Sequence, residues 1–242
     1  MKAVILASGI GSRLMPLTKE VPKCLLTINS KTILESELEM LTSCGIDKVI
    51  ITTGHLHSKV EDHLSNHYAG LAVTLVENKQ YASTNYIYSL WLAKDFIDED
   101  IILLHGDMVF DTLLLEKLIQ SSFDNGVLVN EEVPPPEKDF KALVDGKLVK
   151  KIGVEVTGRN AFFCAPVYKV SLNAFSKWMA EIDRFVAQGN STCYAEDALN
   201  NLLGDIELRA MFYGKEFCME IDTIQDLATA REYYAQHQHK LS

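Results

Sequence analysis

The start of the chain joins an apolar strand directly to a glycine-rich turn. Residues 1–7 read MKAVILA, an apolar run typical of a buried β-strand, and Ser8, Gly9 and Gly11 follow at once. A strand that ends in such a turn presents successive backbone N–H groups, which form a cradle for phosphate oxygens. Glycine lets the backbone approach a ligand closely because it has no Cβ. This segment therefore predicts a phosphate-binding loop at the end of a sheet strand.

The spacing after the turn distinguishes it from two better-known phosphate loops. The three-glycine dinucleotide fingerprint is incomplete, because Leu14 stands where the third glycine would fall. The Walker loop closes on Gly-Lys-Ser/Thr, whereas Gly11 is followed here by Ser12 and Arg13. What remains is G-x-G-S-R-L-x-P-x-T-x-x-x-P-K, which ends at Lys23. Arg13 and Lys23 add fixed positive charge, so the pattern predicts a site for a nucleoside triphosphate.

Strand-like and helix-like segments alternate over the first half of the chain. We expect strands at 2–6, 48–52, 72–77 and 100–105, with helices at 33–43, 57–65 and 85–94 between them. This alternation predicts βαβ units and a largely parallel sheet, in which ligands bind beyond the carboxyl ends of the strands. Segments 126–130, 141–144, 147–154 and 161–167 predict further, mixed strands. The expected fold is α/β, a Rossmann-like mixed, mostly parallel sheet flanked by helices.

Composition limits the classes of protein that need to be considered. With 242 residues, 48% of them hydrophobic, the chain can bury the core of one α/β domain. The net charge of -10 without a basic block argues against nucleic acid or an anionic membrane as a partner. Five widely spaced cysteines, no visible targeting segment and only strand-sized apolar runs predict a cytoplasmic enzyme with reduced thiols. The oligomeric state is not indicated.

The motif resembles that of the nucleotidyltransferase family, which makes sugar nucleotides and related activated head groups. The resemblance continues through Gly54-His55, Y-A-S-T-N at 81–85, Gly106-Asp107 and E-I-D-T at 220–223. In length and in its later motifs the chain is most similar to the short cytidylyltransferases that act on phosphocholine or on phosphonates. The resemblance implies the nucleotide-diphospho-sugar transferase fold in a single domain, 1–242. It also implies an NTP-binding part at about 1–125 and an acceptor-binding part at about 126–228.

Two carboxylates are candidate metal ligands. Asp107 follows an apolar strand, a position where an acid often begins a loop or caps a helix, and Asp222 could equally cap the helix that follows it. Glu220 and Asp222 share one face if the segment is extended. The resemblance implies that Asp107 and Asp222 bind Mg²⁺ on the triphosphate, with Glu220 assisting. Mg²⁺ suits such a site because it takes carboxylate oxygens together with substrate phosphates and waters.

The resemblance also implies roles for the residues around the nucleotide. Arg13 would hold the leaving β- and γ-phosphates, and Lys23 would stabilise the α-phosphate and position the nucleophile. A phosphate nucleophile needs no general base, because its second pKa is about 6. Asn85 is expected either beside the base or acceptor, or as an ordinary helix N-cap, and the pattern around it favours CTP. The expected nucleotide-binding residues are Leu6, Ala7, Ser8, Gly9, Gly11, Ser12, Arg13, Tyr81, Ala82 and Asn85.

The acceptor is less well defined by the sequence. Quaternary ammonium groups are bound in aromatic cages, and the resemblance leads us to expect tryptophans where this chain has Phe140 and Ala195. Phe140 and Tyr194 are candidates for a partial aromatic box. Glu196 and Asp197 are candidates for binding a primary ammonium, or form an ordinary charged helix start. Phosphocholine, 2-aminoethylphosphonate and related small phosphates or phosphonates all stay open.

Three functions follow as hypotheses. The leading one is a Mg²⁺-dependent cytidylyltransferase that transfers CMP from CTP to a small phosphate or phosphonate and releases pyrophosphate. The second is a sugar-1-phosphate nucleotidyltransferase that uses UTP, dTTP or GTP. The third is a non-catalytic, regulatory nucleotide-binding domain. The presence together of Arg13, Lys23, Asp107 and Asp222 argues against the third.

Overall fold

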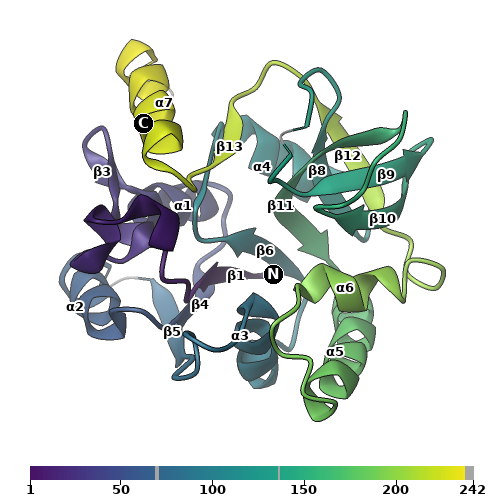
Figure 1. Ribbon diagram of the computed structural model, residues 1–242, viewed down its shortest axis with the longest axis horizontal. Helices are drawn as coiled ribbons and strands as arrows, with labels where there is room; N and C mark the ends of the chain where they lie inside the picture. Colours follow the sequence, from purple (N-terminus) through teal and green to yellow (C-terminus); the bar gives the residue numbers. More distant parts are fainter. Residues whose placement is uncertain (69–70, 136, 238–242) are drawn as a thin grey trace.

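A nine-stranded mixed sheet forms the centre of the molecule in the computed structural model, which describes residues 1–68, 71–135 and 137–237 (Figure 1). The strand order is β5-β4-β1-β6-β11-β8-β12-β10-β9. Parallel pairing joins β5, β4, β1 and β6, and also β8 and β12, whereas β11 is antiparallel to both β6 and β8. The strands are β1 (Lys2–Ala7), β4 (Lys48–Thr53), β5 (Ala72–Glu77), β6 (Ile101–His105), β8 (Gly126–Asn130), β9 (Lys141–Asp145), β10 (Leu148–Gly153), β11 (Ala161–Val170) and β12 (Arg209–Tyr213).

Helices cover both faces of this sheet because the side chains of its inner strands are apolar on both sides. In β1, Val4 belongs to one buried cluster with helices α3 (Tyr86–Ala93), α5 (Leu172–Ala187) and α6 (Ala195–Asn200). Ile5 belongs to the opposite cluster, with α1 (Ile33–Ser43), α2 (His57–His67) and α4 (Thr112–Gln120). Continuous apolar runs of this kind are typical of strands covered on both faces. The expected α/β fold, a mixed sheet flanked by helices, is confirmed. The sheet is not mostly parallel, because four of its described strand pairs are parallel and five are antiparallel.

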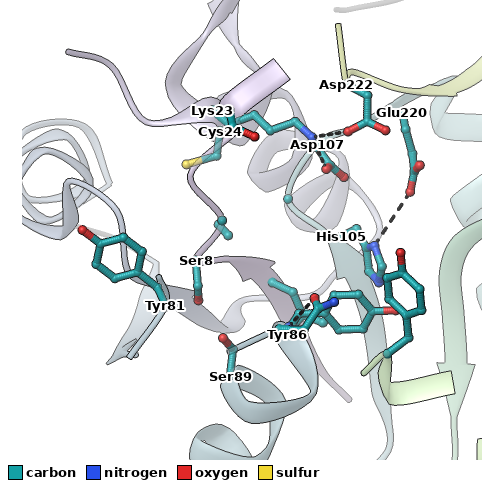
Figure 2. Close-up of a pocket in the computed structure, with 18 of the residues that line it drawn as sticks. Ser8, Lys23, Cys24, Tyr81, Tyr86, Ser89, His105, Asp107, Glu220 and Asp222 are labelled. Carbon is teal, nitrogen blue, oxygen red and sulfur yellow. Dashed lines mark hydrogen bonds and ion pairs between the residues drawn. The ribbon is translucent and has the colours of Figure 1, made fainter. Parts of the chain in front are cut away.

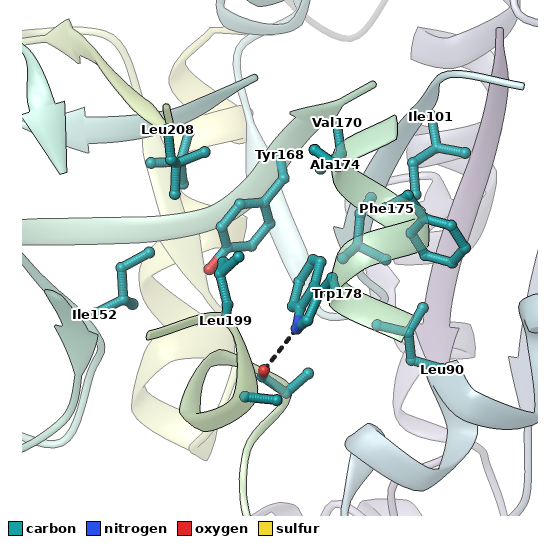
Figure 3. Close-up of a cluster of buried hydrophobic side chains, with 14 of the residues drawn as sticks. Leu90, Ile101, Ile152, Tyr168, Val170, Ala174, Phe175, Trp178, Leu199 and Leu208 are labelled. Carbon is teal, nitrogen blue, oxygen red and sulfur yellow. Dashed lines mark hydrogen bonds between the residues drawn. The ribbon is translucent and has the colours of Figure 1, made fainter. Parts of the chain in front are cut away.

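Aromatic side chains fill the first of these clusters around α5. Trp178 lies edge-to-face against Tyr168 of β11, with ring centroids 6.3 Å apart, and its Nε1 donates to the carbonyl oxygen of Ala195 at 2.8 Å (Figure 3). This hydrogen bond attaches the start of α6 to the core. The segment before α6 is therefore held against the same face of the sheet as α3.

A third apolar cluster connects the two ends of the chain. Leu14 from the N-terminal loop, Ile28 from the hairpin of β2 (Thr27–Ile28) and β3 (Lys31–Thr32), and Tyr234 from α7 (Ile224–Gln236) are all buried in it. Figure 1 shows α7 beside this hairpin. A small second sheet pairs β7 (Met108–Phe110) with β13 (Cys218–Glu220) in antiparallel register, Met108 opposite Glu220. These contacts bring the C-terminal segment to the carboxyl ends of β1 and β6.

No helix in the described ranges is both long and apolar enough to cross a membrane.

Candidate active site

A pocket of about 350 Å³ opens at the carboxyl ends of β1 and β6. The N-terminal loop, the segment before α3, the turn after β6 and the segment after β13 all contribute to its walls. Most of the residues predicted from the sequence line it, which agrees with the rule that ligands bind at this edge of a parallel sheet. The predicted residues in the lining are Leu6, Ala7, Ser8, Gly9, Gly11, Ser12, Arg13, Lys23, Tyr81, Asn85, Asp107, Phe140, Tyr194 and Asp222.

The glycine turn is built for close approach of a ligand. Gly11 has a positive φ of 66°, and the Thr18 hydroxyl donates to its carbonyl oxygen at 2.8 Å, which fixes the turn. A Cβ at Gly9 would meet no heavy atom within 4 Å, so the backbone there faces open space. By contrast, a Cβ at Gly54 would lie 2.7 Å from the carbonyl oxygen of Ser8. The end of β4 therefore packs directly against the turn and supports it.

Four charged side chains from distant parts of the sequence meet beside this turn. The Lys23 ammonium donates to Asp107 and also to Oδ1 of Asp222, the latter at 2.9 Å. The guanidinium of Arg13 lies 2.8 Å from the same oxygen of Asp222. Figure 2 shows Lys23 reaching across the pocket to both carboxylates. The β7–β13 pairing explains why residues 107 and 222 are neighbours, since the amide of Ile221 donates to the carbonyl oxygen of Asp107 at 2.9 Å.

Each charge in this cluster depends on its partners. Burial by itself would lower the pKa of Lys23, but the two carboxylates outweigh it and raise that pKa above the ordinary value for lysine. Burial likewise opposes the charge of Asp107, yet Lys23 holds the pKa of its carboxyl below the ordinary value. The cluster therefore consists of charged groups that a bound phosphate or metal ion can reorganise.

The donor set suits a hard divalent cation. Oδ1 of Asp107 is buried without a hydrogen-bond partner in the described part of the chain. Asp107 and Glu220 present oxygens within 4.8 Å of a ring nitrogen of His105, and Glu220 and Asp222 form a similar group with Asp139. An ammonium already lies between the carboxylates of Asp107 and Asp222. Asp107 and Asp222 thus already share one cation, and Asp107 has an oxygen that is not hydrogen-bonded. Both features suit Mg²⁺, which prefers oxygen ligands.

An aromatic wall lies on the side of the pocket next to Glu220. The Tyr86 and His105 rings meet at a centroid distance of 4.5 Å, and Phe140 and Tyr194 meet at 4.9 Å. Nδ1 of His105 is 3.8 Å from Oε1 of Glu220 (Figure 2). Burial, and then the charges of Asp107 and Asp222, raise the pKa of Glu220 well above its ordinary value. This compartment combines ring faces with acidic oxygens.

Three predicted residues do not line the pocket. Ala82 is absent from its walls, and so are Glu196 and Asp197. The Asp197 carboxylate accepts from the backbone amide of Tyr194 at 2.9 Å, which makes it part of an ordinary helix start. Glu196 is buried behind the pocket and bonded to two tyrosine hydroxyls. As placed, neither carboxylate faces an acceptor, because each already serves the local structure.

The sequence left Asn85 and Asp222 as possible helix N-caps, and only Asn85 is one. Asn85 is the N-cap of α3, because its side chain accepts from the amide of Tyr86 at 2.7 Å, and it also lines the pocket. Asp222 is not the cap of α7. Thr223 takes that position in a capping box with Asp226, which leaves the Asp222 carboxylate for Lys23 and Arg13.

Several lining residues were not predicted from the sequence. His105 directly precedes Gly106-Asp107 at the strand end, and Tyr86 directly follows Asn85, so adjacency to the motifs was an available signal. Asn78 has no such signal: it is buried, and its amide donates to Ser89 at 3.0 Å. Lys138 is held at the rim by an ion pair with Asp226 at 2.8 Å. The pairing of Lys138 with Asp226 spans 88 residues and is not encoded locally.

The structure is thus an α/β fold with a glycine turn and a charged cluster at the carboxyl ends of its strands. The nucleotidyl transferase family model matches residues 2–135, more than half of the chain. The chain belongs to the nucleotidyl transferase family.

Three relatives are named for small phosphate or phosphonate acceptors. The chain is 34% identical over 135 residues to the CMP-5'-(3-aminopropyl)phosphonate synthase of Streptomyces rubellomurinus, an alignment that covers 56% of this chain but 22% of that protein. It is 28% identical to the choline-phosphate cytidylyltransferase of Streptococcus pneumoniae, covering 96% of this chain and 97% of the relative. It is 26% identical to the 2-aminoethylphosphonate cytidylyltransferase of Lancefieldella rimae, with 93% and 90% covered.

A solved structure supports the fold independently. The CTP:phosphocholine cytidylyltransferase of Streptococcus pneumoniae superposes with a TM-score of 0.78 at 24% identity, over 96% of this chain and 98% of that one. At this identity the likeness establishes the fold.

Proposed function

We propose that the protein transfers CMP from CTP to a small phosphate or phosphonate and releases pyrophosphate. One observation carries the proposal: Lys23, Arg13, Asp107 and Asp222 converge beside a glycine turn whose backbone faces open space at Gly9. Relatives that align over nearly the whole chain are named as cytidylyltransferases for phosphocholine and 2-aminoethylphosphonate, which supports CTP as the nucleotide.

The chemistry requires two anions to meet in line. An oxygen of the acceptor phosphate forms a bond to the α-phosphorus of CTP, and the bond from that phosphorus to the bridging oxygen breaks, so that pyrophosphate leaves with the electron pair. Arg13, whose side chain is 56% exposed, is free to turn from Asp222 to the leaving phosphates. Lys23 is placed to exchange one carboxylate partner for a non-bridging oxygen of the α-phosphate.

Asp107 and Asp222 would hold Mg²⁺, with Glu220 assisting. When bound, the ion would neutralise charge on the α-phosphate and on the incoming oxygen. No group on the protein needs to take up a proton, because the acceptor phosphate is already ionised near neutral pH.

The acceptor would bind between the aromatic wall and Glu220. Ring faces attract a positively charged head group through cation–π contacts, and an oxygen of Glu220 can accept a hydrogen bond from a primary ammonium. A hexose would instead need several uncharged hydrogen-bonding partners on this side, where Phe140 and Tyr194 stand. This difference favours a cationic acceptor over a sugar 1-phosphate.

Pyrophosphate release tests the proposal directly. Purified protein with Mg²⁺ is assayed with CTP, UTP, dTTP and GTP, each against phosphocholine, 2-aminoethylphosphonate and glucose 1-phosphate. Turnover with CTP and one of the first two acceptors is the expected result. Turnover restricted to another nucleotide with the sugar phosphate would replace the proposal with the sugar-nucleotide alternative, and nucleotide binding without any turnover would support a regulatory domain.

A further inference from the structure

We propose that Glu196 is a positioning residue for the acceptor, because its buried carboxylate holds the Tyr86 ring in the pocket wall. The inference rests on the proposed function and adds a residue that touches neither substrate. Glu196 has 1% of its surface exposed. Its Oε1 accepts from the hydroxyl of Tyr168 at 2.8 Å, and its Oε2 accepts from the hydroxyl of Tyr86.

A buried carboxylate at this position lowers the stability of the fold, so we expect it to have a role beyond packing. Among the described residues no ion pair of Glu196 is found, and the side-chain hydrogen bonds to its carboxylate come from two phenol hydroxyls. Burial of a charge without a counter-ion lowers stability, whereas an apolar side chain of similar size would pack at no such cost. Charge-assisted hydrogen bonds are short and directional, so what this arrangement provides is fixed geometry.

The two hydroxyls that Glu196 binds differ in their surroundings. Tyr168 is fully buried in the core, edge-to-face against Trp178, and the same tryptophan bonds the carbonyl oxygen of Ala195 (Figure 3). Glu196 is thus fixed from the core side by Tyr168 and by its own neighbour in the chain. Tyr86 lies on the other side and is a pocket residue. The rigid core is connected to the pocket wall through this carboxylate.

Tyr86 in turn contacts the other aromatic rings of the pocket wall. Its ring lies 4.5 Å from that of His105 and 5.8 Å from that of Tyr194, measured between centroids. His105 faces Glu220, and Tyr194 packs on Phe140. Because the Tyr86 hydroxyl is engaged with Glu196 and not with the pocket, its loss would act on substrate only through the position of the ring. The nucleotide side, around Gly9 and Tyr81, is not part of this chain of contacts.

The two tyrosines provide a matched pair of variants. Tyr86→Phe and Tyr168→Phe each remove one hydroxyl bond to the same carboxylate, but only the first residue lines the pocket. With CTP and Mg²⁺ saturating, and with the best acceptor from the nucleotide panel, we expect Tyr86→Phe to raise the acceptor KM about tenfold. The KM for CTP should stay within about twofold of wild type. Tyr168→Phe leaves the bond between Glu196 and Tyr86 in place, so it should lower the melting temperature and raise the acceptor KM less than Tyr86→Phe does.

Replacement of the carboxylate itself provides the second comparison. Glu196→Ala should raise the acceptor KM at least as much as Tyr86→Phe, and Glu196→Gln, which keeps one acceptor oxygen, should restore part of the loss. If Glu196→Ala does not fold, the pair of phenylalanine variants decides the question.

The outcomes separate this inference from the proposed function. An active wild type whose acceptor KM is unaffected by Tyr86→Phe, or equally affected by Tyr168→Phe, would reduce Glu196 to a structural role and overturn the inference alone. A wild type inactive with every nucleotide and acceptor would overturn the proposed function, and the inference with it.

Discussion

Lys23 neutralises two carboxylates that come from opposite ends of the sequence. It bonds both Asp107 and Asp222, and both partners are mostly shielded from water. Removal of one member of such a buried group leaves its partners with uncompensated charge, so each member affects stability as well as chemistry. A test at the residue scale must therefore measure folding alongside turnover.

We expect Lys23→Ala to lower kcat by about 10² to 10³, since it removes positive charge from the α-phosphate as charge develops there. Steady-state kinetics with CTP and acceptor saturating measure the effect, and the melting temperature of the variant shows whether it folds. Lys19→Ala, in the same loop but exposed and away from the pocket, is the control and should behave as wild type. A normal kcat for Lys23→Ala would remove the residue from the reaction.

Asp107→Asn tests the metal assignment. The amide keeps the size of the side chain but gives up the charge, and we expect kcat/KM to fall at least about a hundredfold, with more Mg²⁺ needed for half-maximal rate. A Mg²⁺ titration of initial rates provides both values. Asp145→Asn, at an exposed strand end, is the control. An unchanged Mg²⁺ requirement in Asp107→Asn would contradict metal binding there.

At the residue scale, the sequence predicted the site residues that belong to a motif. It missed site residues that are placed by contacts outside the motifs. Arg13 and Lys23 follow the glycine turn at fixed spacing, so their place beside a phosphate site could be expected. Tyr86 was missed although it directly follows Asn85, and its hydroxyl bonds Glu196, 110 residues away. Asn78 is held by Thr53 and Ser89, and the local pattern gives no signal for these contacts. Glu196 was a candidate for binding the acceptor, because its depth behind Tyr86 cannot be read from a helix start.

At the scale of elements, a helix cap places a candidate metal ligand. Asp226, in the first turn of α7, accepts from the amides of Asp222 and Thr223 at 3.1 and 2.8 Å. The same carboxylate that closes the capping box therefore fixes the backbone of Asp222. The sequence predicted the helix here but assigned the cap to Asp222 as an alternative, because Asp and Thr are both good caps.

Asp226→Ala should therefore reduce both stability and turnover. We expect a loss of about 1 kcal/mol in the free energy of unfolding, typical of a lost cap, and a kcat lowered about tenfold. Glu35→Ala is the matched control, because Glu35 closes the equivalent capping box on α1 and bonds the backbone of Thr32 instead of Asp222. Urea denaturation and steady-state kinetics on both variants separate the effects. An equal loss of kcat in Glu35→Ala would show that stability alone explains the result.

The elements that the sequence predicted best have strong local patterns. Helix α1 and strands β5 and β8 have the expected bounds, since each has clear apolar periodicity or turn residues at its ends. Helix α5 was not assigned, although Ser171 caps it by accepting from the amide of Ala174 at 3.3 Å and its buried residues recur at helical spacing. The helical pattern of α5 was present in the sequence, but it directly follows the apolar strand β11 and was not separated from it.

At the scale of the whole molecule, one continuous sheet joins the expected nucleotide and acceptor parts. β11, from the second part, pairs with β6 of the first part and with β8 of its own part. The buried cluster around Trp178 contains side chains from both parts, among them Leu90 and Leu199. Pairings between distant strands depend on which apolar faces meet in the folded state. The sequence therefore predicted β6, β8 and β11 but not their pairing with one another.

This continuity predicts that the two parts unfold together and that CTP stabilises both. At a hundred times its dissociation constant, CTP with Mg²⁺ should add about 2.7 kcal/mol to the free energy of unfolding. For a chain of this length that corresponds to a rise of roughly 5 to 10 °C in the melting temperature. Scanning calorimetry should give one endotherm that moves as a whole, and Asp107→Asn should lose most of the shift. Two endotherms, of which only one moves with CTP, would instead divide the chain into separately folding parts near residue 125, because only the part that holds the nucleotide gains its binding energy.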